Sequence, residues 1–337
     1  MRNLRNEHEI MTNWKGDLDE PVVSICCITY NHEAYIEDAL EGFLMQETGF
    51  PFEILIHDDA STDRTADIIR EYEAKYPRLI KPIYQTENQW SKGIRFMNPN
   101  FLYPVAKGEF IALCEGDDYW VSPMKLQRQH DVLLDNKDCS YVFHSVLKEN
   151  KTFAARDVAN WDKPKPKPKQ VKSRFKDVVL SNFIPTLSLF FYKKHIPLGV
   201  AIYKEKIVSG DYFLVFMLSS KGMGYYLDEN MGVHVDHDGG ITKIHKMEEL
   251  KDKNLDLDGK LELFDHLFDI LPKEFHRDLK KAAVLRAYLG EVKRLFYSGR
   301  YFGACRLLVK SFIDYPGVLG GYLKRKVKYV KVYTCDH

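Results

Sequence analysis

The sequence predicts an α/β protein with a mostly parallel sheet flanked by helices and a helical extension at the C-terminus. Short apolar runs rich in β-branched residues alternate with segments whose apolar residues recur at helical spacing, which is the pattern of βαβ units. Acidic and polar residues directly follow three of these runs. Parallel sheets bind ligands beyond the carboxyl ends of their strands, so we expect the functional site there.

Local signals predict the individual elements. A compact, β-branched run after Pro21 predicts the first buried strand, and Asn31 is placed to cap the helix behind it. A second cap cluster, Ser61–Asp63, is expected to open the next helix. The expected elements, in order, are strand 22–28, helix 36–44, strand 52–57, helix 66–74, strands 80–84, 110–114 and 187–192, and an apolar helix over 212–218.

Composition divides the chain into three expected parts. A polar N-terminal tail precedes the α/β domain, and a helical region with a long apolar stripe follows it. Between the two halves of the α/β domain lies a stiff, cationic Lys–Pro stretch over residues 163–169, either a solvated loop or a loop near an anionic substrate or membrane. The parts are residues 1–20, residues 21–245 with halves 21–150 and 177–245, and residues 246–337.

Charge and cysteine usage exclude several classes of protein. The 49 basic and 48 acidic residues leave a net charge of +1, so there is no global basic field to bind nucleic acid. Six cysteines without CxxC spacing, and no apolar stretch long enough to span a membrane, indicate a reduced, cytoplasmic protein. Residues 322–333 interleave basic and apolar side chains, which suits a plain surface element or a peripheral contact with the inner face of the membrane.

Two acidic clusters at strand ends are candidates for chemistry. Asp58 and Asp59 close the second predicted strand, where they either cap the next helix or accept hydrogen bonds from a ribose or a base. The turn Glu115–Asp118 holds three carboxylates in four residues, which repel one another unless donors or a cation offset them. Mg²⁺ typically uses one or two carboxylates and shares its other ligands with phosphates, so a divalent cation site is favoured over an exposed acidic turn.

Motifs that the sequence lacks exclude other chemistries. No GxGxxG or GxxxxGK[ST] motif occurs, so neither a dinucleotide site nor a P-loop is supported. A GxSxG nucleophile elbow is also missing. Glycoside hydrolysis needs two carboxyl groups on opposite sides of the scissile bond, and the acids here lie in a single turn.

Three motifs together resemble one known family. The run from Val23 to Asn31 comes first, the run from Ile56 to Thr65 follows, and Glu115–Trp120, with the sequence EGDDYW, completes the order. In this order they resemble family 2 glycosyltransferases of the inverting, bacterial type, which have the GT-A fold; the resemblance covers residues 21–150 well and 177–245 more loosely. It implies transfer of a sugar from a nucleotide-diphosphate sugar, with a UDP-sugar favoured, to a hydroxyl of a glycan or lipid-linked glycan in cell-surface polysaccharide synthesis.

The resemblance also implies which residues bind the donor and the metal. The strand ends and the acidic turn would hold the nucleotide sugar, and the acidic turn with a histidine from a later loop would hold Mn²⁺ or Mg²⁺. The implied donor-binding residues are Thr29, Tyr30, Asn31, Glu33, Asp58, Asp59, Asp117 and Asp118. The implied metal ligands are Asp117, Glu115 and His237, and the alternative for the His-rich segment around His237 is a hydrolytic zinc site.

The second half of the α/β domain supplies candidates for the acceptor side. Asp211 precedes an apolar helix and resembles the family's general base, the alternative being a plain N-cap. Trp120, Tyr119 and Tyr212 are candidates for the acceptor wall, with core packing the alternative for two of the three. Two rival functions stay open. One is a non-catalytic domain that binds nucleotide sugar or glycan, and the other is a sugar nucleotidyltransferase, although Thr29–Glu33 lacks the Gly-rich, basic character of a triphosphate loop.

Overall fold

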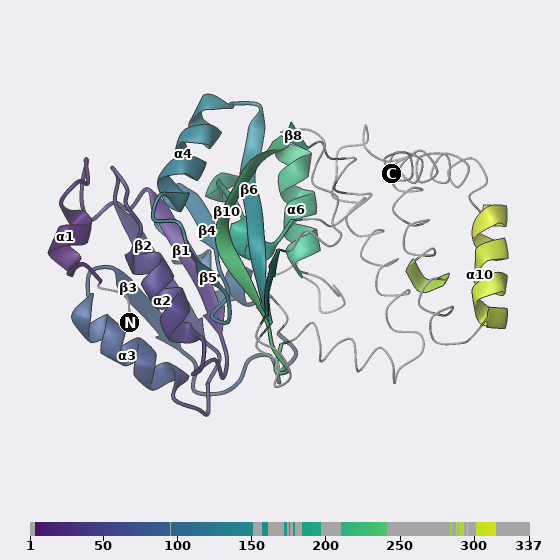
Figure 1. The fold of residues 1–337 in the computed structure, drawn as a ribbon, viewed down its shortest axis with the longest axis horizontal. Coiled ribbons are helices and arrows are strands. Elements are labelled where there is room, and N and C mark those ends of the chain that lie inside the picture. Colours follow the sequence, from purple (N-terminus) through teal and green to yellow (C-terminus); the bar gives the residue numbers. More distant parts are fainter. Residues whose placement is uncertain are drawn as a thin grey trace. The chain divides into compact units, whose positions relative to one another are not determined.

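The computed structural model of the chain divides into two compact units, and a single mixed β-sheet lies at the centre of the larger one (Figure 1). This unit comprises residues 1–178, 183–205 and 210–244, and the second unit comprises residues 179–182, 206–209 and 245–337. The structure describes residues 4–94, 96–150, 157–160, 172–173, 175, 178, 184–196, 210–240, 284, 288, 290–292, 295 and 301–314.

Ten strands make up the sheet within the described residues. The order along the sheet is β3–β2–β1–β4–β9–β6–β10–β5, with β7 paired to β6 and β8 paired to β10. The strands are β1 Val23–Thr29, β2 Phe52–Asp58, β3 Ile80–Tyr84, β4 Phe110–Leu113, β5 Tyr119–Trp120, β6 Cys139–Asn150, β7 Asp157–Asn160, β8 Lys172–Ser173, β9 Phe190–Tyr192 and β10 Met223–Asp236.

The directions of the strands decide which strand ends share an edge of the sheet. β1 pairs in parallel with β2 and with β4. β9 is antiparallel to both β4 and β6, and β10 is parallel to β6. β10 therefore runs in the same direction as β1, although it comes much later in the chain. The carboxyl ends of β1, β2, β4 and β10 consequently lie along one edge of the sheet, which we call the carboxyl edge.

Helices flank the sheet, whose inner strands are buried on both faces. All seven residues of β2 are buried, as expected for a parallel strand covered on both sides. On α2, Ile36, Leu40 and Phe43 recur at helical spacing, and all three are fully buried in the main core. The helices are α1 Glu7–Met11, α2 Ile36–Leu44, α3 Thr65–Lys75, α4 Lys125–Asp135, α6 Gly210–Lys221 and α10 Tyr301–Asp314, with short helical turns η1 Asn98–Leu102, η2 Thr186–Ser188 and η3 Lys193–His195.

The predicted elements of the first half are confirmed, with small differences at their ends. The strand expected over 80–84 is β3 itself, whereas the strand expected over 187–192 is a short helical turn followed by β9. The prediction that Asn31 caps a helix is wrong, because α2 begins at Ile36 and Asn31 bonds to the loop after β2. Asp63 does bond the first backbone N–H of α3, as its place in the cap cluster predicts.

Several predictions fall on parts of the chain that lie outside the described residues. These are the Lys–Pro stretch 163–169, most of the helical region after residue 246, and the basic segment 322–333. Within that helical region, helix α10 is the long continuous segment among the described residues. Among the described residues, no helix combines the length and the apolar character needed to cross a bilayer.

Candidate active site

Four loops meet at the carboxyl edge, one after each of β1, β2, β4 and β10 (Figure 1). The first three follow the strand ends that the sequence singles out. The fourth carries His237 and reaches the same edge because β10 runs parallel to β1. The topology thus brings together residues from the beginning and the end of the larger unit.

The loops after β1 and β2 are bonded to each other. The backbone N–H of Asn31 donates to Ser61 Oγ (2.9 Å), and Asn31 Oδ1 accepts from the backbone N–H of Thr62 (2.7 Å). Glu33 Oε2 accepts from the backbone N–H of Arg64 (3.0 Å). Asn31 has φ of 54°, a left-handed conformation that asparagine tolerates better than most residues. In this structure Asn31 and Glu33, both implied donor-binding residues, fix the two loops to each other through these hydrogen bonds.

Asp58 and Asp59 also bond to the protein itself. Asp58 accepts hydrogen bonds from the hydroxyl and the backbone N–H of Ser61, while burial raises its pKa against the effect of those bonds. The two oxygens of Asp59 accept from the backbone N–H groups of Gln89 (2.7 Å) and Trp90 (3.1 Å). Asp59 thereby fixes the loop after β3, a loop that sequence reasoning missed. Its only signal in the sequence was polar residues following a third strand.

Asp118 ties the acidic turn after β4 to strand β10. Its carboxylate accepts from the backbone N–H of Val235 (2.9 Å) and lies 3.1 Å from His234 Nδ1. Asp118 is 1% exposed, and burial raises its pKa more than the bond from His234 lowers it. Burial acts to lower the pKa of His234, but the bond to Asp118 raises it overall. These contacts hold the end of β10 against the acidic turn and so bring His237 close to Asp117.

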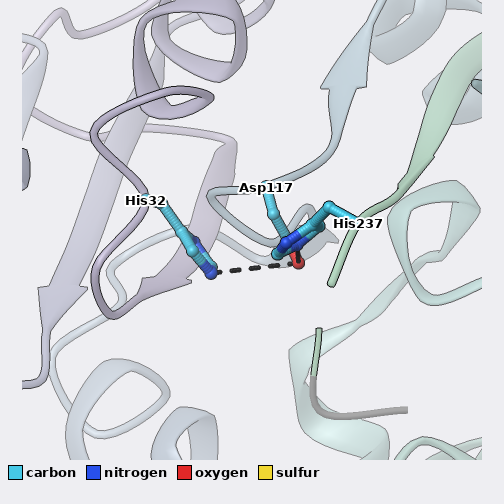
Figure 2. A group of neighbouring side chains, drawn as sticks. All are labelled: His32, Asp117 and His237. Atoms are coloured by element: carbon cyan, nitrogen blue, oxygen red, sulfur yellow. Dashed lines mark hydrogen bonds and ion pairs between the residues drawn. The ribbon is translucent and has the colours of Figure 1, made fainter. Parts of the chain in front are cut away.

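Asp117 faces two histidines (Figure 2). Its Oδ2 lies 3.0 Å from His237 Nε2 and 3.9 Å from His32 Nε2. The ring of His237 also packs against Tyr35, with 4.5 Å between ring centres. Burial acts to raise the pKa of Asp117, yet the hydrogen bond from His237 and the charges of both histidines lower it overall. Burial lowers the pKa of His32.

Gly116 allows the acidic turn to lie against the end of β1. A Cβ at this position would lie 2.6 Å from Thr29 Oγ1 and 3.1 Å from His32 Nδ1. The backbone N–H of Gly116 donates to the carbonyl of Ile28 (2.9 Å), which fixes this approach. Only glycine leaves room for Thr29 and His32 beside the turn.

Two overlapping groups of side chains among the described residues could hold a metal ion. One is His32, Asp117 and His237, and the other is Glu115, Asp117 and Asp118; within each group the ligand atoms lie within 4.8 Å of one another. Carboxylate and imidazole donors are suitable ligands for a divalent cation. Burial and the charges of neighbouring carboxylates raise the pKa of Glu115 well above its ordinary range. A divalent cation fits this donor set because it would offset the charge that the neighbouring acids impose on one another.

Asp211 lies in the first turn of α6, where its Oδ1 accepts from the backbone N–H of Tyr212 (2.8 Å). Its charge contributes to the raised pKa of Glu115, so Asp211 is close enough to the acidic turn to act on it electrostatically. The structure therefore brings a carboxylate from the later part of the chain within electrostatic range of the turn.

The residues predicted to form the acceptor wall differ in their surroundings. Trp120 is fully buried, donates its Nε1–H to the carbonyl of Leu187 and packs against Phe43, so assigning it to the acceptor wall is wrong for this structure. Tyr212 is buried as well. Tyr119 is partly exposed, and its hydroxyl donates to Glu149.

Comparison with known proteins identifies the family. Residues 24–197, just over half of the chain, match the model of glycosyl transferase family 2. The chain belongs to that family. Within it, the implied donor and metal residues of the sequence analysis lie along the carboxyl edge, and His32 is an additional residue there that the motifs did not indicate.

Curated relatives of the chain cover part of its length. An uncharacterized protein of Mycobacterium tuberculosis is 46% identical over 126 residues, which are 37% of this chain and 35% of that protein. TuaG of Bacillus subtilis, provisionally named a teichuronic acid biosynthesis glycosyltransferase, is 33% identical over 144 residues, 42% of this chain and 52% of TuaG. The matched segment thus spans between a third and about half of these relatives.

Two solved structures share the fold. TarS 1–349 of S. aureus in complex with UDP-GlcNAc aligns with a TM-score of 0.50 at 17% identity, over 90% of this chain and 91% of that chain. The mannosyltransferase PcManGT of Pyrobaculum calidifontis, in complex with GDP-Man and Mn²⁺, aligns with a TM-score of 0.51 at 16% identity, over 86% of this chain and 79% of that chain. The predicted GT-A fold is confirmed.

Proposed function

We propose that the protein is an inverting glycosyltransferase that moves a sugar from a nucleotide-diphosphate sugar to a hydroxyl acceptor. The observation that carries the proposal is the meeting of Asp117 with His237 and His32 at the carboxyl edge, beside the bonded loops after β1 and β2. In a member of family 2, a nucleotide diphosphate bound at this edge would lie against the hydrogen-bonded loops after β1 and β2. It would also face groups suited to its charge.

Each group has a defined task in the proposed reaction. The loops after β1 and β2 are held rigid before the donor arrives, so binding loses little conformational freedom there. Tyr30, which is 42% exposed, is available to contact the donor from the first of these loops. Asp117 and His237 lie where the diphosphate would be bound, and a divalent cation held there would neutralise the leaving diphosphate.

Asp211 is the proposed general base. It takes the proton of the acceptor hydroxyl while the acceptor oxygen forms its bond to the anomeric carbon. The bond from that carbon to the diphosphate oxygen breaks, and the nucleoside diphosphate leaves with the electron pair. The position of Asp211 in the first turn of α6, close enough to act on Glu115, supports this role.

A UDP-sugar is the proposed donor and a glycan or lipid-linked glycan the proposed acceptor, in cell-surface polysaccharide synthesis. The complex of TarS with UDP-GlcNAc supports uracil as the nucleobase of the donor. The complex of PcManGT with GDP-Man shows that the same fold also accommodates guanine. The name of TuaG supports the class of acceptor. We place the reaction in the cytoplasm, at the inner face of the membrane.

The membrane half of this proposal has its own support and test. Helix α10 exposes Phe302, Val309 and Ile313, and the sequence after it contains five basic residues between 324 and 331. Such a combination suits an anionic lipid surface. Sedimentation with phosphatidylglycerol vesicles at low salt should capture the protein, and replacing the five basic residues by Gln should release it. No capture of the unaltered protein would end this part of the proposal.

The direct test of the function is release of nucleoside diphosphate from a panel of nucleotide sugars with Mn²⁺. Slow release without acceptor and faster release with a glycan acceptor are expected. Asp211→Asn should lower kcat by about 10²–10⁴-fold with little change in donor affinity. Asp67→Asn, also in the first turn of a helix but on the exposed surface, where Asp67 pairs with Arg70, is the control and should match the unaltered protein. Donor binding without release by the unaltered protein would instead indicate a non-catalytic binding domain.

A further inference from the structure

We propose that His32 is a metal ligand, and that His32, Asp117 and His237 form a site that prefers Co²⁺, Zn²⁺ and Mn²⁺ to Mg²⁺. The proposal deepens the proposed function and rests on it, since the cation would be shared with the donor diphosphate. His32 comes from the loop after β1 and was not among the residues implied by the sequence motifs.

The distances fit one ion. Two ligand atoms that are each about 2.1 Å from an ion can be at most about 4.2 Å apart. Asp117 Oδ2 lies 3.0 Å from His237 Nε2 and 3.9 Å from His32 Nε2, and all three ligand atoms lie within 4.8 Å of one another. Figure 2 shows the two rings and the carboxylate converging from three separate segments of the chain. Both distances to Asp117 Oδ2 lie within this limit, and we expect the histidine rings to adjust on metal binding so that their two nitrogens also come within it.

The surroundings of His32 hold its ring in the orientation that a ligand requires. Its Nδ1 lies 3.2 Å from Thr29 Oγ1, which leaves Nε2 directed toward Asp117. Metal-binding histidines commonly use their second ring nitrogen in this way, because a donated hydrogen bond fixes the tautomer and the ring plane. Gly116 leaves the space that this arrangement needs, since a Cβ there would meet both Thr29 and His32.

The alternative, all-carboxylate group is less able to hold an ion. One of its members, Asp118, already accepts from the backbone N–H of Val235 and is paired with His234. It is buried, and moving it onto an ion would break the contacts that fix β10 against the turn. Without Asp118, the carboxylate group keeps two ligands, Glu115 and Asp117, whereas Asp117 with the two histidines offers three.

The donor set determines which ions are preferred. Mg²⁺ favours carboxylate, phosphate and water oxygens in a regular octahedron. Imidazole nitrogens suit later transition metals, and affinity for such sites rises from Mn²⁺ toward Co²⁺ and beyond. With two imidazoles and one carboxylate, the site should bind Co²⁺ tightest of the ions Co²⁺, Mn²⁺ and Mg²⁺, and Mg²⁺ weakest.

The test is equilibrium metal binding without nucleotide, by competition with a fluorescent chelator. The unaltered protein should bind Co²⁺ at least about tenfold tighter than Mg²⁺. His32→Gln should weaken Co²⁺ binding by about tenfold or more and Mg²⁺ binding much less. His8→Gln makes the same chemical change on the exposed surface of α1 and should bind as the unaltered protein does. Equal affinities for Co²⁺ and Mg²⁺, or an unchanged Co²⁺ affinity in His32→Gln, would overturn the proposal.

A spectroscopic measurement keeps the test valid if His32→Gln folds poorly. Pulsed electron paramagnetic resonance of the Mn²⁺-loaded, unaltered protein should show coupling to imidazole ¹⁴N from two histidines, and His237→Gln should reduce it to one. Coupling to no nitrogen contradicts the site. Failure of the proposed function is distinct, because it would leave the metal binding intact while no nucleotide sugar is turned over. Turnover that persists in EDTA, with no metal bound, would instead remove the metal site and leave the transferase.

Discussion

The loops after β1 and β2 and the turn after β4 both carry acidic residues at strand ends, but the partners of those acids differ. In the first region, Asp59 and Asp63 accept hydrogen bonds from backbone N–H groups of neighbouring loops. In the second, Asp117 faces the imidazoles of His32 and His237. Acids whose oxygens accept from the backbone, such as Asp59 and Asp118, serve architecture, whereas Asp117, which faces two imidazoles, is available for chemistry.

Removing the charge of Asp117 should have the largest effect on function. Asp117→Asn keeps the volume but takes away the carboxylate that both groups of candidate metal ligands share. We expect turnover to fall by at least about 10³-fold, and metal binding in the absence of nucleotide to be lost. Turnover assays, metal competition and a thermal melt measure the three effects. Normal turnover by a folded Asp117→Asn protein would remove this residue from the chemistry.

Asp118, the next residue, should behave in the opposite way and affect stability first. Asp118→Ala leaves the buried N–H of Val235 without this acceptor and removes the contact between Asp118 and His234. We expect the free energy of unfolding to fall by about 3 kcal/mol, measured by urea titration. The control is Asp67→Ala, which breaks an exposed ion pair with Arg70 and should cost less than about 1 kcal/mol. Equal effects of the two substitutions would erase the distinction between Asp118 and a surface acid.

The sequence predicted the strands with local signals and missed those that depend on distant partners. β1 to β4 are compact apolar runs, so their composition is sufficient. β6 and β10 are longer, but β10 contains shifts of register against β6 and its apolar alternation is interrupted near Leu227 and Asn230. A strand of this kind is recognised by its pairing, which a single sequence does not display.

The same reasoning explains which parts of the site were foreseen. Asp117 and His237 were placed together through their resemblance to family motifs, and the structure does bring them together. His32 carries no comparable signal, because its orientation depends on Thr29 and on the space left by Gly116, two contacts made only after folding. Trp120 was misplaced for a related reason, since an aromatic residue beside an acidic turn has the same sequence signal whether it faces solvent or the core.

Asp59 offers an intermediate case with a smaller expected effect. Asp59→Asn would set an amide N–H₂ against the N–H of Gln89 or Trp90, so one of the two loop hydrogen bonds is lost. We expect the free energy of unfolding to fall by about 1–3 kcal/mol. The KM for the donor should rise by a larger factor than kcat falls. Hydrogen exchange at the amides of Gln89 and Trp90 separates the causes. Faster exchange there means that Asp59 acts through the loop, whereas unchanged exchange with a raised KM means direct contact with the donor.

The smallest expected effect is the dependence of stability on pH. It compares two histidines whose partners differ, as the partners of the acids do. His144 on β6 is buried, and in the part of the chain that the structure describes its Nε2 has no hydrogen-bond partner. Burial, followed by the charge of Lys125, lowers the pKa of His144 well below its ordinary value. The unfolded chain therefore binds a proton at about pH 6.5 that the folded protein does not. The contribution of His144 to the free energy of unfolding is present above that pH. It is lost as the pH falls below it, by up to about 1.4 kcal/mol per pH unit.

His234 should act in the reverse direction, because Asp118 raises its pKa above the ordinary value. Its contribution to stability is present below about pH 6.5 and is lost as the pH rises through the folded pKa. Urea titrations of the unaltered protein, His144→Gln and His234→Gln between pH 5 and pH 8 test both. His144→Gln should flatten the fall in stability below about pH 6.5, whereas His234→Gln should remove the loss of stability that His234 causes as the pH rises above about 6.5. If both substitutions change the slope in the same direction, the partner of a histidine does not decide its role in this protein.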